Sequence, residues 1–119
     1  MPLYEHTFIA RQDLSGQQAQ TLGETFSQLV ADNGGTVGKV EYWGLRNLTY
    51  RINKNRKGHY IFMNLEASSA AVDELERNLR LNEDVLRYLT VKVDAHEEGP
   101  SIVLQAKSSR DERQRRDRF

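Results

Sequence analysis

A basic and aromatic segment is the part of this sequence whose residue types point most directly to a chemical partner. Residues 42–65 are 24 consecutive positions without Asp or Glu, and five of them are aromatic. The segment also carries five Lys or Arg side chains: Arg46, Arg51, Lys54, Arg56 and Lys57. Because the whole chain balances 17 basic against 17 acidic residues, this is a local positive surface in a neutral protein. Such a surface favours a polyanion, above all nucleic acid.

The same cations also have a purely structural explanation. Exposed hairpins are often rich in lysine, because charge at a sheet edge prevents pairing with other chains. The aromatic residues Tyr42, Trp43, Tyr50 and Tyr60 favour the functional interpretation, since such rings stack on bases or pack against a partner. An RNA-recognition motif is not indicated, because the residues after Gly58 depart from the aromatic pattern of its third strand.

No other group of residues predicts an active site. Residues 34–39 resemble a phosphate loop superficially, but Val40 replaces the required Ser or Thr and a helix precedes the loop instead of following it. Asp73, Glu74 and Glu76 are expected on the solvent side of an amphipathic helix. We therefore expect no catalytic residue, no cofactor and no small-molecule substrate, so the protein is not expected to be an enzyme.

Metal binding and disulfide chemistry are disfavoured by composition. The chain has no cysteine, and its three histidines, His6, His59 and His96, are widely separated. Without thiolates or clustered imidazoles we expect no metal site. His6 alternates with Tyr4 and Phe8, which predicts a hydrogen-bonded histidine in the core or at a sheet edge.

Length and hydropathy predict one soluble domain. At 119 residues, with 38% hydrophobic and 29% charged residues, the chain has room for one modest core. It contains no run of apolar residues long enough to cross a membrane, and Met1-Pro2 leads straight into a strand pattern. We expect a cytoplasmic protein that does not bind membranes.

Periodicity and turn residues predict the secondary structure. Strands are expected at 3–10, 36–52, 59–67 and 85–93, with a bulge at Gly44 and a polar turn at 53–58. One helix is expected between a capping box at Ser15 and the Gly34-Gly35 pair, and another between Ser68 or Ser69 and Asn82. The order βαββαβ predicts an α+β, ferredoxin-like split βαβ fold, a four-stranded antiparallel sheet with both helices on one face.

Both faces of the predicted sheet contain apolar residues, although helices can cover only one of them. Tyr60 and Phe62 alternate with Ile61, Met63 and Leu65, and the sequence leaves open which set faces the helices. Aromatic residues often lie half exposed on sheets, so a bare face is one possibility and a face covered by a partner is the other. We predict a protein-partner interface at Trp43, Tyr60 and Phe62.

The C-terminal residues differ in composition from the rest. Residues 1–94 form the predicted domain, whereas residues 95–119 have little apolar periodicity and end in a run of mixed charge. We expect this tail to be disordered when free. Its basic residues could follow a phosphate backbone, but charged tails commonly only solvate the chain end.

Several motifs together resemble one known family. The stretches 38–50 (GKVEYWGLRNLTY) and 76–85 (ERNLRLNEDV), with Tyr4-Glu5, Asn53-Lys54 and Gly58-His-Tyr60, are similar to the bacterial small-subunit ribosomal proteins numbered six. The resemblance spans about residues 3–93. It implies a split βαβ fold, no enzymatic activity, and binding to the central domain of 16S ribosomal RNA as a heterodimer with the eighteenth small-subunit protein. Family members often have proline where this chain has Arg51, which restores a backbone donor and adds charge.

We therefore predict a structural protein of the small ribosomal subunit in which Arg46, Arg51, Lys54, Arg56 and Lys57 contact RNA. A function from another class also fits the fold: a ferredoxin-like regulatory or ligand-sensing domain that homodimerises through its open sheet face. A pocket with convergent polar groups would mark that function.

Overall fold

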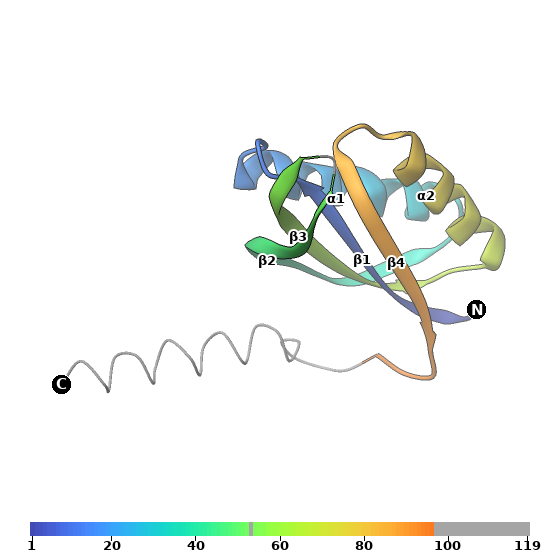
Figure 1. Ribbon diagram of the computed structural model, residues 1–119. Coiled ribbons are helices and arrows are strands. Elements are labelled where there is room, and N and C mark those ends of the chain that lie inside the picture. Colours follow the sequence, from blue (N-terminus) through green and yellow to red (C-terminus); the bar gives the residue numbers. More distant parts are fainter. Residues whose placement is uncertain (53, 97–119) are drawn as a thin grey trace.

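The computed structural model of the chain describes residues 1–52 and 54–96, so nearly all of the predicted tail at 95–119 lies outside the described residues. A four-stranded antiparallel sheet carries two helices on one face (Figure 1). Its elements are β1 (Leu3–Arg11), α1 (Gly16–Asp32), β2 (Thr36–Ile52), β3 (Asn55–Glu66), α2 (Ser69–Leu81) and β4 (Val85–Val93). The strand order β2-β3-β1-β4 makes β2 and β4 the edge strands. The predicted ferredoxin-like α+β fold is confirmed.

The helix ends follow the predicted capping chemistry. The Ser15 hydroxyl accepts a hydrogen bond from the Gln18 backbone N–H at 3.1 Å, and the Gln18 side chain accepts one from the Ser15 N–H at 2.8 Å. These two bonds satisfy N–H groups that the first helical turn leaves unpaired. Gly34, just beyond α1, has a φ of 84°, which a residue with a side chain adopts only at a cost. Ser68, and not Ser69, caps α2.

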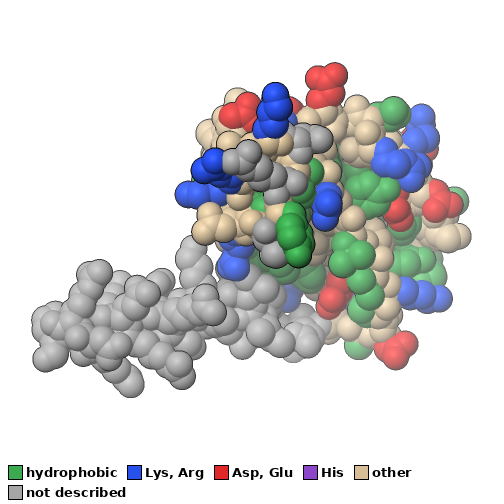
Figure 2. Space-filling view, viewed as in Figure 1, with side chains coloured by type: hydrophobic (Ala, Val, Ile, Leu, Met, Phe, Trp, Pro, Cys, Tyr) green, Lys and Arg blue, Asp and Glu red, His purple; other side chains and the backbone are tan. Residues whose placement is uncertain are grey.

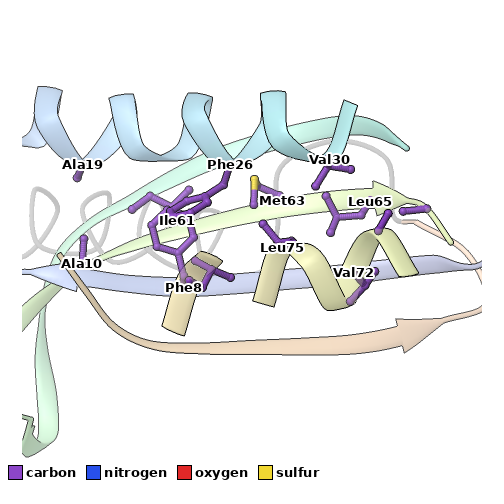
Figure 3. Packing of buried hydrophobic residues seen from close by; sticks show 13 residues of the cluster. Phe8, Ala10, Ala19, Phe26, Val30, Ile61, Met63, Leu65, Val72 and Leu75 are labelled. Carbon is purple, nitrogen blue, oxygen red and sulfur yellow. The ribbon is translucent and has the colours of Figure 1, made fainter. Parts of the chain in front are cut away.

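The core lies between the helices and the inner face of the sheet (Figure 3). Ile61, Met63 and Leu65 point from β3 toward the helices, which settles the face that the sequence left open. Phe8 from β1 is fully buried and packs edge to face on Phe26 of α1, with 5.3 Å between ring centroids. Because side chains alternate along a strand, Tyr60 and Phe62 lie on the opposite, open face.

The predicted six-residue turn at 53–58 is wrong from Asn55 onward. β3 begins at Asn55, which pairs with Ile52, and Lys57 pairs with Asn47 further along the ladder. Lys54 lies in the tight connection with a φ of 68°. The sequence misleads here because ladder hydrogen bonds join backbone groups, so a run of polar side chains can still form a strand. The hairpin arm is consequently longer than expected.

His6 is a buried core histidine, as predicted. Its side chain is inaccessible to solvent, and Nδ1 lies 2.7 Å from the Thr90 hydroxyl of β4. The other ring nitrogen, Nε2, is buried and has no hydrogen-bond partner among the residues that the structure describes. Burial lowers the pKa of His6 to about 4, because an imidazolium ion in this apolar site would lose its hydration. His6 is therefore neutral in the folded protein near neutral pH.

Acidification should destabilise the fold through His6. The unfolded chain takes up a proton on this residue below its ordinary pKa of 6.5, whereas the folded chain does so only near 4. The unfolded state thus binds more protons between these values, and stability falls as pH drops. We expect a loss of about 2 kcal/mol between pH 7 and pH 5 in urea titrations. The variant His6→Gln should lose most of this slope, and an unchanged slope would contradict the assignment.

Candidate RNA-binding hairpin and partner-binding face

The predicted RNA-binding residues lie on one arm of the molecule, residues 46–57 of β2 and β3, here called the basic hairpin. The side chains of Lys54, Arg56 and Lys57 are at the surface. Arg46 is half-buried, and its Nε donates a hydrogen bond to the Trp43 carbonyl at 3.1 Å. The Arg51 backbone belongs to β2, and its side chain lies outside the described part of the structure. Figure 2 shows several Lys and Arg side chains on the β2–β3 side of the molecule, with others elsewhere on the same view.

Gln12, in the connection between β1 and α1, fixes the start of β3. Its side-chain oxygen accepts hydrogen bonds from the backbone N–H groups of Arg56 at 3.2 Å and Lys57 at 3.1 Å. Its own backbone N–H donates to the Asn55 side chain at 3.2 Å. Two of these hydrogen bonds thus hold the backbone from which the Arg56 and Lys57 side chains extend, and the third holds the Asn55 side chain. Sequence analysis missed Gln12, because a lone glutamine in a loop gives no signal of a contact more than forty residues away.

His59 anchors the base of the hairpin from within the fold. Its Nε2 lies 2.7 Å from the Leu14 carbonyl, and its Nδ1 lies 2.7 Å from the Tyr42 hydroxyl. A carbonyl only accepts, so Nε2 carries the proton and Nδ1 accepts from the tyrosine. Burial raises the pKa of Tyr42 above its ordinary value, which keeps its hydroxyl a donor. The histidine therefore joins β2, β3 and the loop before α1, and it has a structural role.

The predicted partner residues lie on the open face, the side of the sheet away from the helices. Trp43 stacks on Phe62 with ring centroids 5.2 Å apart and an interplanar angle of 13°. The indole Nε1 of Trp43 donates to the Glu41 carboxylate at 3.1 Å, which fixes the ring. Phe62 is only 6% exposed beneath this stack, whereas Trp43 and Tyr60 are half-buried. In the isolated chain Trp43 is thus the outer aromatic surface and Phe62 supports it.

The open face continues onto β4 as an uncovered apolar surface. Leu89 is 64% exposed and Val91 is 45% exposed. They pair with Thr7 and Glu5 of β1, and Thr7 pairs on its other side with Phe62. Hydrophobic side chains are visible along β4 in Figure 2. An apolar sheet face of this kind on a small domain is typical of a protein-binding surface.

Two other kinds of site find no support in the described residues. Within residues 1–52 and 54–96, no three His, Cys, Asp or Glu side chains gather so that they could hold a metal ion. In the same part of the chain, no helix combines the length and the apolar character that crossing a bilayer requires.

Comparisons with known proteins give a consistent result. The profile of the family described as ribosomal protein S6 matches residues 3–92. A small ribosomal subunit protein bS6 of Allorhizobium ampelinum is 60% identical over 117 residues, which are 98% of this chain and 76% of the relative. The bS6 protein of Dinoroseobacter shibae is 57% identical over 116 residues, with 98% and 99% covered.

Solved structures agree in fold. The crystal structure of the 30S ribosomal protein S6 from Thermotoga maritima superimposes with a TM-score of 0.72 at 22% identity, covering 93% of this chain and 97% of that one. The C-terminal domain of the MgtC protein from Mycobacterium tuberculosis gives a TM-score of 0.54 at 14% identity, covering 83% and 95%. The second likeness shows that the fold alone does not specify a function.

Sequence and fold together define a protein of the small ribosomal subunit. In particular, the chain belongs to the ribosomal protein S6 family. It is accordingly a structural protein of the cytoplasmic ribosome and not an enzyme, as the sequence predicted.

Proposed function

We propose that the chain binds the central domain of 16S ribosomal RNA through the basic hairpin, together with the eighteenth small-subunit protein. The observation that carries this proposal is the surface position of Lys54, Arg56 and Lys57 on an arm that Gln12 and His59 hold in place. Because the backbone that carries these cations is fixed, the arm itself loses little entropy on meeting phosphates, and it favours folded RNA of one shape.

Binding is driven by release of counterions from the RNA. Each phosphate that a Lys or Arg neutralises frees condensed cations, and the affinity therefore falls with salt. Arg46 lies near the base of the arm and adds positive charge there. Its Nε is held by a hydrogen bond to the Trp43 carbonyl. Arg51 adds a further positive charge to β2 of the hairpin. The resulting complex holds one RNA junction in a single conformation on which later proteins assemble.

The open face supplies the surface for the protein partner. Trp43 presents a large ring fixed by Glu41 and Phe62, so it loses little conformational entropy on binding. Tyr60, Leu89 and Val91 extend the surface across the sheet. Because β2 contributes to both surfaces, the partner and the RNA would meet along this side of the domain. Phe62 contributes from below by supporting Trp43.

Neutralising the hairpin tests the RNA part of the proposal. The triple variant Lys54→Ala, Arg56→Ala, Lys57→Ala should bind a central-domain transcript more weakly in the presence of the eighteenth protein. The slope of log K against log salt should flatten by about 0.7 to 0.9 for each phosphate that the variant no longer neutralises. Filter binding measures the slope. The KCl concentration is varied from about 50 to about 300 mM, where counterion release dominates the salt dependence.

A charge-matched variant provides the control. Arg77→Ala, Arg80→Ala, Lys92→Ala removes the same formal charge from α2 and β4, away from the hairpin. We expect it to keep the slope of the unmodified protein. If the folded hairpin variant keeps the slope of the unmodified protein, as the control does, the hairpin cations do not bind phosphates.

A further inference from the structure

A polar hollow lies at the foot of the basic hairpin. It has a volume of about 400 Å³ and is formed by the end of β1, residues 54 and 55 at the start of β3, and the loop before β4 with the first residues of that strand. The lining residues used below are Arg11, Gln12, Asp13, Lys54, Glu83 and Leu86. The volume falls within the range of about 300 to 1,000 Å³ that small-ligand sites occupy. It is therefore large enough for one nucleobase.

The charges in this hollow balance, which limits the kind of ligand. Two basic side chains, Arg11 and Lys54, oppose two acidic ones, Asp13 and Glu83. Arg11 is also paired with Asp84 at 2.6 Å and with Asp13 at 3.5 Å, so much of its charge is already neutralised. A phosphate would lie against two carboxylates here, and a cation would lie against Lys54. The hollow favours a neutral ligand with both donors and acceptors.

Unused hydrogen-bonding groups in the hollow have both polarities. The Gln12 side-chain nitrogen is a donor, since the hairpin backbone engages the oxygen of that amide. Glu83 offers carboxylate oxygens as acceptors, and Leu86 provides an apolar contact. The edge of a nucleobase presents such a mixture of donors and acceptors.

The hollow adjoins the basic hairpin, which favours a nucleobase as its ligand. Lys54 belongs both to its lining and to the basic hairpin, and Gln12 contacts the backbone of Arg56 and Lys57. An RNA strand whose phosphates contact the cations of the basic hairpin would bring a base to the mouth of the hollow. Proteins that recognise RNA by sequence commonly bind unstacked bases of loops and bulges in this way.

We propose that this hollow accepts one unstacked base of the RNA strand that the basic hairpin holds, an inference that rests on the proposed function. The carboxylate of Glu83 accepts from a base amino group, as acidic side chains do in direct base recognition. The hairpin then supplies affinity and the hollow supplies sequence preference, since phosphate contacts alone carry no sequence information.

Two variants test the hollow without touching the hairpin cations. Glu83→Gln converts an acceptor oxygen into a donor amide, and Leu86→Trp fills the hollow. With the central-domain transcript and the eighteenth protein, each should bind about tenfold more weakly at an unchanged salt slope, because base contacts release no counterions. Glu76→Gln on α2 makes the same charge change elsewhere and should bind as the unmodified chain does, or slightly more tightly.

The outcomes separate this inference from the proposed function. If Glu83→Gln binds as tightly as Glu76→Gln, or if its salt slope flattens, the base-binding hollow is refuted whatever Leu86→Trp does. Thermal melts identify a Leu86→Trp protein that does not fold, and Glu83→Gln alone then decides. If the hairpin triple variant still flattens the slope, RNA binding by the hairpin stands without the hollow. If that variant keeps the slope, the proposed function itself fails.

Discussion

Replacing Phe8 with alanine is expected to lower the free energy of unfolding by about 3 to 5 kcal/mol. Phe8 is fully buried at the centre of the inner sheet face, where β1 pairs with both β3 and β4. The substitution removes its edge-to-face contact with Phe26 and leaves a cavity between the sheet and α1. For a domain of this size the melting temperature should fall by more than about 10 °C. Denaturant titration with thermal melts measures both quantities.

Leu81→Ala is the matched control for this experiment. Leu81 ends α2 and is 70% exposed, so the substitution removes apolar atoms that water already reaches. Its effect should remain within about 0.5 kcal/mol. A destabilisation below about 1 kcal/mol for Phe8→Ala would mean that the core is not packed around β1 as described.

Replacing Trp43 with alanine should weaken binding of the eighteenth small-subunit protein by about 2 kcal/mol or more, roughly thirtyfold. Trp43 is half-buried on the open face, and its ring is held by the hydrogen bond to Glu41 and the stack on Phe62. Calorimetric titration gives the affinity. Phe62 is less suitable for this test, because it is buried in the isolated chain and its truncation would also reduce stability.

Val40→Ala serves as the control for Trp43→Ala. Val40 lies on the same strand and is 48% exposed, but it lines a hollow beside α1 on the helix side of the sheet. The Val40→Ala protein should bind the partner as the unmodified chain does. Normal partner binding by a folded Trp43→Ala protein would refute the interface assignment, as would a weakening that Val40→Ala reproduces.

Local signals predicted most of the secondary structure. The capping box at Ser15, the left-handed Gly34 and the cap at Ser68 each satisfy backbone groups within a few residues, so the chain needs no distant contact to specify them. Alternating apolar residues likewise predicted β4 with its observed bounds. The start of β3 was missed because its first residues are polar, and hydropathy gives no sign of the ladder that they form with β2.

Tertiary contacts limited what could be predicted of the site. Phe62 and Met63 are both apolar and both buried, so hydropathy could not say which of them faces the helices. The surface cations were visible in the sequence, but the contacts that position them, from Gln12 and Leu14, join residues about 45 positions apart. Such contacts arise only when the fold brings β1 beside β3.

We propose that the basic hairpin binds the central domain of 16S ribosomal RNA. Ultraviolet crosslinking in cells, followed by sequencing of the RNA attached to the purified protein, measures this binding. Crosslinked peptides should come from residues 46–57, and the reads should concentrate in the central domain for the unmodified chain. The triple variant Lys54→Ala, Arg56→Ala, Lys57→Ala should lose most of the central-domain reads. Reads spread evenly over cellular RNA, or an unchanged central-domain signal in the triple variant, would refute RNA binding by the hairpin.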